Sequence, residues 1–117
     1  MSAQIRRPRR NASASLRIDS TPNGFELWGD DERRCDVDWS DVARIVAFKV
    51  DLLTMDAVCL EVQLASGAVC LVDEEATGFW ELVTVIKRVL PISQQEWEQT
   101  VVPSAFVENR TVIFQRA

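Results

Sequence analysis

Hydrophobic and polar residues alternate with a period of two along much of the chain from Ala14 onward, a pattern typical of half-buried β-strands. Turn-forming residues interrupt the pattern, as in Ser20–Gly24, where proline presets φ and Asn-Gly tolerates positive φ. The segment Val42–Val50, the fourth strand in this pattern, is largely apolar on both faces. The pattern predicts six strands before the first helix, with apolar positions in Ala14–Ile18, Phe25–Leu27, Cys35–Trp39, Val42–Val50, Ala57–Ala65 and a segment that begins near Val69.

The last two of these strands are predicted to form a hairpin. Ser66-Gly67 separates them and is a signal for a two-residue turn. A turn of this length would set Leu64 opposite Val69 and Val62 opposite Leu71. The hairpin register, and with it the face on which each side chain lies, depends on this turn.

From Gly78 the period changes to that of an amphipathic helix, which we expect to end at Leu90, before Pro91. Thr77 is the expected N-cap, since a threonine oxygen can accept a hydrogen bond from the first helical turn. The apolar residues recur at the i, i+3, i+4, i+7 spacing of one buried stripe: Phe79, Leu82, Val83, Ile86, Val89 and Leu90.

Two short elements are expected after this helix. Ser93–Glu96 fits the capping box that starts helices, so a short second helix should carry Trp97 and Val101 on one side. Thr111–Arg116 alternates again and predicts a last strand.

The order of these elements predicts an α+β domain over residues 13–117, preceded by a flexible basic arm over residues 1–12. Its strands should be mostly antiparallel and form a meander, either as an open barrel or as two packed sheets. One amphipathic helix should cap the meander, and a short C-terminal helix and strand should follow.

A strand meander closed by a helix resembles the pleckstrin-homology-like superfold, especially its small bacterial members. The resemblance covers about Ala14 to Leu90 and includes the Val37–Ile45 stretch. The chain departs from that pattern because it has six strands before the helix instead of seven, and because it continues past the helix. Its first hairpin loop, Ser20–Gly24, lacks the basic residues of the lipid-binding members, so the resemblance does not imply inositide binding.

Charge is distributed unevenly along the chain. The net charge is −5, but residues 1–17 carry five arginines and no acidic residue. The remaining 100 residues therefore carry 8 basic and 18 acidic side chains. Because nucleic acids and anionic lipids are bound through lysine and arginine, this acidic body is not expected to bind nucleic acid or phosphoinositide membranes.

Histidine is absent, which excludes every catalytic site built on a Ser-His or Cys-His pair. The three cysteines, Cys35, Cys59 and Cys70, lack the close ligand pairs of zinc sites. The predicted hairpin register also keeps Cys59 and Cys70 beyond the ~7 Å Cα limit of a disulfide. Three reduced thiols, and no apolar stretch near the ~18 residues of a membrane span, suit a cytoplasmic protein.

Three segments could carry a function. The acidic cluster Asp73, Glu74 and Glu75 could hold a divalent cation, or could simply be a solvated helix start. The apolar connection with Leu52, Leu53 and Met55, and Trp80 off the buried helix stripe, could form a protein interface or pack against the domain itself. The basic arm contains Arg6, Arg7, Arg9 and Arg10, and could give weak, salt-sensitive contacts.

We therefore expect a noncatalytic protein-interaction module that binds a protein partner or a second copy of itself, in a role such as that of an inhibitor or immunity protein. We expect no enzymatic activity and no cofactor or metal, and the sequence identifies no small-molecule ligand. Two alternatives stay open. One is a metal-dependent enzyme using the cluster at residues 73–75, and the other is contact of the arginine arm with nucleic acid or an anionic membrane.

Overall fold

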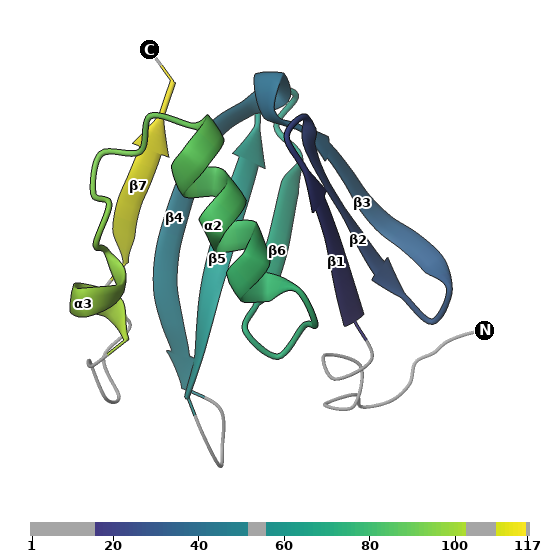
Figure 1. The fold of residues 1–117 in the computed structure, drawn as a ribbon, viewed down its shortest axis with the longest axis horizontal. Helices are drawn as coiled ribbons and strands as arrows, with labels where there is room; N and C mark the ends of the chain where they lie inside the picture. The colour runs from purple at the N-terminus through teal and green to yellow at the C-terminus, as the bar shows by residue number, and fades with distance from the viewer. Residues whose placement is uncertain (1–15, 52–55, 103–109, 117) are drawn as a thin grey trace.

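Two antiparallel sheets and one main helix form the α+β fold that the sequence predicts (Figure 1). The computed structural model describes residues 16–51, 56–102 and 110–116, and only the backbone of residues 51 and 56. Within these residues no strand ladder joins the sheets, so they do not close into a barrel. The three-stranded sheet has the order β1 (Leu16–Thr21), β2 (Gly24–Gly29), β3 (Glu32–Asp38). The four-stranded sheet has the order β6 (Val69–Asp73), β5 (Asp56–Leu64), β4 (Val42–Asp51), β7 (Thr111–Gln115).

A tight corner, the 3-10 turn η2 (Trp39–Asp41), connects the two sheets. The carboxylate of Asp38 caps it by accepting bonds from the backbone N–H of Ser40 at 2.9 Å and from its hydroxyl at 2.8 Å, and these bonds lower the pKa of Asp38. Trp39 is buried as predicted, but it lies in this turn and not in the third strand. Its ring packs 5.5 Å from that of Phe25, and its Nε1 donates to the carbonyl of Thr21. The corner is thus held from both sides.

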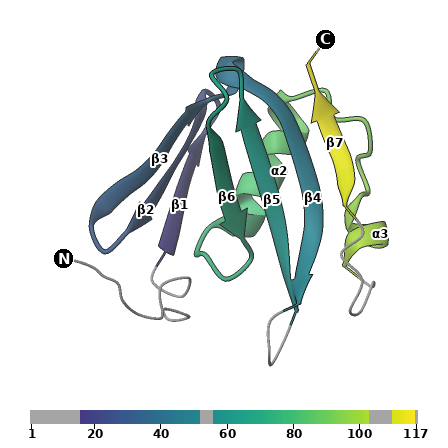
Figure 2. The same ribbon diagram turned by 180° about the vertical axis from the view of Figure 1, so that it is seen from behind.

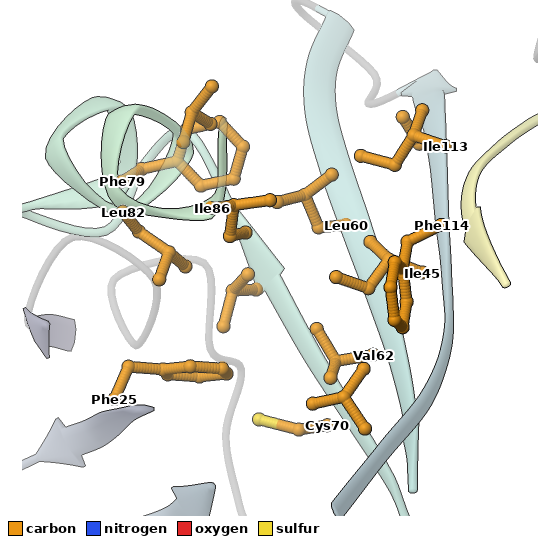
Figure 3. Close-up of a cluster of buried hydrophobic side chains, with 14 of the residues drawn as sticks. Phe25, Ile45, Leu60, Val62, Cys70, Phe79, Leu82, Ile86, Ile113 and Phe114 are labelled. Carbon is orange, nitrogen blue, oxygen red and sulfur yellow. The ribbon is translucent and has the colours of Figure 1, made fainter. Parts of the chain in front are cut away.

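Helix α2 (Phe79–Val89) packs its apolar stripe into the core between the sheets. The buried residues of α2, which are Phe79, Leu82, Val83 and Ile86, all belong to the predicted stripe. Its other two members are Val89, which is half-buried, and Leu90, which is buried but follows the last residue of the helix. Figure 3 shows Ile86 pointing toward Leu60 of β5, and Phe25 of β2 toward Cys70 of β6. Each such side chain stabilises the fold by about 1.5–3 kcal/mol through removal of apolar surface from water. The described helices include none that is long and apolar enough to cross a membrane.

The C-terminal elements lie beside β4. Helix α3 (Glu98–Val101) is shorter than predicted and begins after Trp97, without a side-chain cap. The prediction of a capping box at Ser93 is wrong, because the N–H of Ser93 donates to the carbonyl of Ile113 at 2.7 Å and its hydroxyl contacts the same strand. Trp97 and Val101 are both buried, as expected for one side of a short helix.

The predicted register of the β5–β6 hairpin is wrong by one residue. Gly67 adopts φ 97°, its N–H donates to the carbonyl of Leu64, and the N–H of Leu64 donates to the carbonyl of Ala68. The loop therefore contains three residues, not two, and it pairs Gln63 with Val69 and Glu61 with Leu71. Since a slip by one residue moves every side chain to the opposite face, Val69 and Leu71 point outward and Cys70 points into the core.

All three cysteines are free thiols. Burial, together with the charges of Asp73 and Glu74, raises the pKa of Cys59 to about 12. Burial also raises the pKa of Cys70, with a contribution from the neighbouring Cys35. Because the thiolate is the reactive form, Cys59 and Cys70 serve as packing residues.

Candidate interaction site

The acidic cluster at the start of α2 is engaged in backbone hydrogen bonds. The side chain of Asp73 accepts from the N–H of Glu75 at 2.9 Å. The side chain of Glu74 accepts from the N–H of Val58 at 2.7 Å, while its own N–H donates to the carbonyl of Val58. Two of the three carboxylates therefore hold the turn that leads from β6 to the helix. Among the described residues there is no group of three or more potential ligands arranged to hold a metal ion.

The same junction binds the edge of β1. The N–H of Ile18 donates to the carbonyl of Thr77 at 2.7 Å, and the N–H of Thr77 donates to the carbonyl of Leu16 at 3.0 Å. Thr77 is not the helix N-cap, contrary to the prediction: the N-cap is Gly78 at φ 93°, with no side-chain bond. A Cβ on Gly78 would lie 2.4 Å from the carbonyl oxygen of Ile18, so only glycine allows this approach.

Trp80 lies on the outer side of α2, off the buried stripe as predicted, and is 41% exposed. Its ring meets Phe79 edge-on at 5.0 Å and stacks on Trp97 at 6.4 Å with an interplanar angle of 15°. Trp97 is only 1% exposed, and its Nε1 has no hydrogen-bond partner in the described structure. Trp80 therefore covers another aromatic ring while presenting part of its own surface to solvent.

Each sheet has two edge strands, and three of the four edges are covered or charged. Thr77 covers β1, and Ser93 contacts the edge of β7. β3 is exposed but carries five charged side chains in seven residues, and its pairing with β2 is interrupted by a bulge. The fourth edge strand, β6, has the sequence Val-Cys-Leu-Val-Asp and contains neither a basic residue nor a proline.

The unpaired side of β6 is defined by its ladder with β5. The bonds Leu64 N–H to Ala68 and Glu74 N–H to Val58 mark two hydrogen-bonded positions at the ends of this ladder. Bonded and non-bonded pairs alternate in an antiparallel ladder, so Val69 and Leu71 direct their N–H and C=O groups away from β5. Within the described structure these groups have no backbone partner.

The side chains along this edge are apolar and open. Val69 is 53% exposed and Leu71 is 57% exposed, and both lie on the outer face of the four-stranded sheet, which faces the viewer in Figure 2. Scattered apolar residues are common on protein surfaces, but two at i and i+2 on an unpaired edge form a continuous apolar border. This border combines unsatisfied backbone groups with exposed hydrophobic area.

A small second core continues inward from this border on the same face. It consists of Val46, Phe48 and Cys59, with Val50 and Val112 packed against it. The guanidinium of Arg110 lies 4.6 Å from the Phe48 ring and pairs with Glu61 at 3.0 Å. Hydrogen bonds from Arg110 and Gln63 lower the pKa of Glu61. Glu61 is directly opposite Leu71, so the apolar border of β6 lies next to the Arg110–Glu61 ion pair. Arg110 of this pair lies over Phe48 of the second core.

The three-stranded sheet presents a contrasting acidic outer face. Asp19, Glu26 and Asp36 lie directly opposite one another across the three strands. Arg17 pairs with Asp19 at 3.1 Å, and Arg33 pairs with Glu26 at 3.1 Å and with Asp36 at 3.4 Å. A shallow hollow of about 270 Å³ adjoins this row. Like charges in opposite positions are unfavourable, and the two arginines offset this, Arg17 at the β1 end of the row and Arg33 at the β3 end.

The structure describes only some of the residues that the sequence predicted as candidate sites. It brings Asp73, Glu74 and Glu75 close to Trp80 through the start of α2. The predicted interface residues Leu52, Leu53 and Met55 and the arm residues Arg6, Arg7, Arg9 and Arg10 lie outside the described residues. The sequence interpretation did not identify Val69 and Leu71 as a candidate site. The signal that could have identified them is Gly67, because a glycine at the third position indicates a three-residue loop over Ala65–Gly67. A loop of that length gives the register in which Val69 and Leu71 face outward.

Comparison with known proteins gives no match to any family model, curated protein or solved structure.

Proposed function

We propose that this chain is a noncatalytic protein-interaction module that binds an extended segment of a partner along β6. The observation that carries the proposal is the open β6 edge, where Val69 and Leu71 combine unpaired backbone groups with exposed apolar side chains. In strand addition, the backbone hydrogen bonds supply affinity and the alternating side chains supply specificity. An edge without protective charges is suited to this mode of binding.

Other features of the chain are consistent with binding and give no support for chemistry. The carboxylates of Asp73 and Glu74 are occupied by backbone N–H groups, which argues for a structural role at this junction. We retain the pleckstrin-homology-like resemblance as a proposal based on the order of elements. We also propose a cytoplasmic location, since three free thiols suit a reducing compartment.

The proposal is tested by comparing variants in partner capture from an extract of the native cells. Val69→Lys with Leu71→Lys places two charges on the β6 edge, and Gln94→Lys with Gln95→Lys adds the same charge at exposed positions elsewhere. We expect the wild type and the glutamine variant to retain the same proteins, and the β6 variant to lose them. Equal retention by the β6 variant would contradict the proposal.

Trp80 offers the competing surface in the same experiment. Trp80→Ala removes the exposed indole of α2 without changing charge. If β6 is the binding edge, this variant should capture partners as the wild type does, provided that its melting curve confirms folding. Loss of capture in Trp80→Ala alone would transfer the binding site to the helix.

A further inference from the structure

We infer that the partner segment bound along β6 is basic, runs antiparallel to β6, and has the order basic, small, apolar, small, apolar from its N-terminus. This inference rests on the proposed function, because it names the chemistry of the partner at the same edge. It follows from three features of β6, which are its open backbone groups, the space beyond its unpaired side, and the side chains along its two faces.

The open backbone groups of β6 belong mainly to two residues. Val69 and Leu71 direct both their N–H and their C=O groups away from β5. The carbonyl of Asp73 already accepts from the N–H of Ala76 at 3.1 Å, so the turn after β6 occupies that end of the edge. The partner segment therefore bonds chiefly at the positions opposite Val69 and Leu71. Antiparallel pairing is the more stable arrangement, and it exchanges about four hydrogen bonds at these two positions.

The space beyond β6 limits the width of the partner. Figures 1 and 2 show β1 on the unpaired side of β6, and α2 packs against β1. The edge of a folded sheet, including that of a second copy, would bring further strands and helices into the place of β1. A single strand needs only about 4.8 Å in the hydrogen-bonding direction. The partner segment is therefore one strand wide, an extended stretch of chain without its own sheet.

The inner face of β6 is closed by Cys70 and Val72. Both are buried in the main core, where Figure 3 shows Phe25 pointing toward Cys70. Directly paired residues of an antiparallel ladder have their side chains on the same face, so residues of the partner segment opposite Cys70 and Val72 point to this closed side. Large side chains there would overpack the core. These two positions of the segment therefore take small residues.

The outer face of β6 is apolar at two positions. Val69 and Leu71 are both more than half exposed on this face. Apolar side chains opposite them would cover this surface and remove it from water, which is favourable. The two positions of the partner segment opposite Val69 and Leu71 are therefore apolar.

Carboxylates set the charge of the partner segment. Asp73, Glu74 and Glu75 lie together at the end of β6, and β6 contains no basic residue. The carboxylate of Asp73 accepts from the N–H of Glu75 at 2.9 Å, which fixes its orientation at the end of the edge. Opposite charges on directly paired residues stabilise a ladder and like charges destabilise it, so a lysine or arginine opposite Asp73 is favoured. The antiparallel direction places this basic residue at the N-terminal end of the segment.

Selection from a displayed library of short random peptides tests the inferred order. The full chain is used as the wild type, as Val69→Lys with Leu71→Lys, and as the control Gln94→Lys with Gln95→Lys. We expect peptides with the order basic, small, apolar, small, apolar to be enriched on the wild type and on the glutamine control, but not on the β6 variant. Enrichment of β6-dependent peptides that are acidic or lack the basic residue would overturn the inference, and so would the absence of any β6-dependent peptide.

Synthetic peptides test the direction and the charge by fluorescence anisotropy. Lys-Ser-Val-Ser-Leu has the inferred order. Its reverse, Leu-Ser-Val-Ser-Lys, is the control of identical composition, and Glu-Ser-Val-Ser-Leu reverses the charge. We expect the first peptide to bind the wild type about fivefold more tightly than either control, because only this peptide, paired antiparallel, places a lysine opposite Asp73. Equal binding of the lysine peptide and its reverse, with no binding of either included, would overturn the inference.

Asp73→Asn tests whether this carboxylate is the source of the charge preference. The amide keeps an oxygen for the N–H of Glu75 but removes the negative charge. The preference for the lysine peptide over the glutamate peptide should fall to about twofold, provided that the melting curve of the variant confirms folding. An unchanged preference in the folded variant would overturn the assignment of the basic residue to the position opposite Asp73.

The outcomes separate this inference from the proposed function. If peptides bind in a β6-dependent way but without a basic residue at the inferred position, the partner has another chemistry, so the inference fails and the proposed function stands. If neither the selected peptides nor the captured proteins depend on Val69 and Leu71, both fail.

Discussion

β3 and β6 are both edge strands whose backbones lack an outer partner in the described structure. Their sequences differ, because β3 is rich in charged residues and β6 is mostly apolar. β3 carries Glu32, Arg33, Arg34, Asp36 and Asp38, and its charges pair with one another and with β2. β6 carries a single charge at its end and exposes a valine and a leucine. Charge on an edge strand keeps it in water, so the comparison separates a protected edge from an open one.

The difference also teaches that exposure alone does not define an interaction surface. Trp80 is partly exposed, but its ring packs against the rings of Phe79 and Trp97, so this side chain also contributes to the packing of the domain. Among the residues that the structure describes, Val69 and Leu71 make no comparable ring or ion-pair contact, and their outward-directed backbone groups have no backbone partner. An interface is expected where exposed apolar area coincides with unsatisfied polar groups.

Opening a covered edge should have the largest effect. Gly78→Ala forces a side chain into positive φ and into the carbonyl of Ile18, and so disrupts the bonds by which Thr77 covers β1. We expect a loss of about 3 kcal/mol in the free energy of unfolding. Gly67→Ala is the control, since it has the same unfavourable φ but no atom within 4 Å, and should cost only about 1 kcal/mol. Urea denaturation measures both, and equal losses would contradict the close-packing argument.

Removing the protection of β3 should have an intermediate effect. Arg33→Thr with Asp36→Thr leaves the net charge unchanged and deletes exposed ion pairs, so stability should change by less than about 1 kcal/mol. Introduced into the Val69→Lys, Leu71→Lys chain, it should create a new open edge and introduce concentration-dependent association. Light scattering of the two chains makes the comparison. If the chain with the threonines stays as monomeric as its parent, charge is not what protects β3.

The smallest effect concerns the ion pair beside Leu71. Bonds from Arg110 lower the pKa of Glu61 in the folded state, so the folded chain binds fewer protons than the unfolded one as pH falls. The stabilisation is present above the ordinary glutamate pKa of about 4.3 and is lost as pH falls through the lowered value. Glu61→Gln should therefore lower stability at neutral pH by less than about 1 kcal/mol and flatten its decline in acid.

Thermal unfolding of Glu61→Gln between neutral and acidic pH measures this effect. Asp36→Asn, in the exposed pair on β3, is the matched control and should shift the melting temperature less at neutral pH. A decline in acid as steep for Glu61→Gln as for the wild type would show that this pair does not stabilise the outer face.

Local patterns in the sequence predict the elements and most of the core. The spacing of Phe79, Leu82 and Ile86 suffices to identify the buried face of α2, because a helix of this length has one apolar stripe. The two apolar faces of β4 were likewise predicted, and they pack into the main core and the second core. Such predictions succeed where the periodicity extends over many residues.

The candidate site depends on features that periodicity does not contain. One residue in the Ala65–Gly67 loop decides whether Leu71 faces the core or the solvent. The open edge of β6 arises only because β7, distant in the sequence, pairs with β4 on the other side of the sheet. Long-range strand order of this kind cannot be deduced from local spacing, so the sequence pointed to Asp73–Glu75 and Trp80 instead.

The most direct test of the account is amide hydrogen exchange of β6 in the wild type alone and in the complex that it forms with protein captured from the native cells. Leu71 N–H has no acceptor within the described chain, whereas Cys70 N–H points toward β5. The account predicts that Cys70 is protected in both samples, and that Leu71 exchanges fast in the chain alone and becomes protected in the complex. Exchange of Leu71 that is equally fast in both samples would contradict the binding of a partner's extended segment along β6.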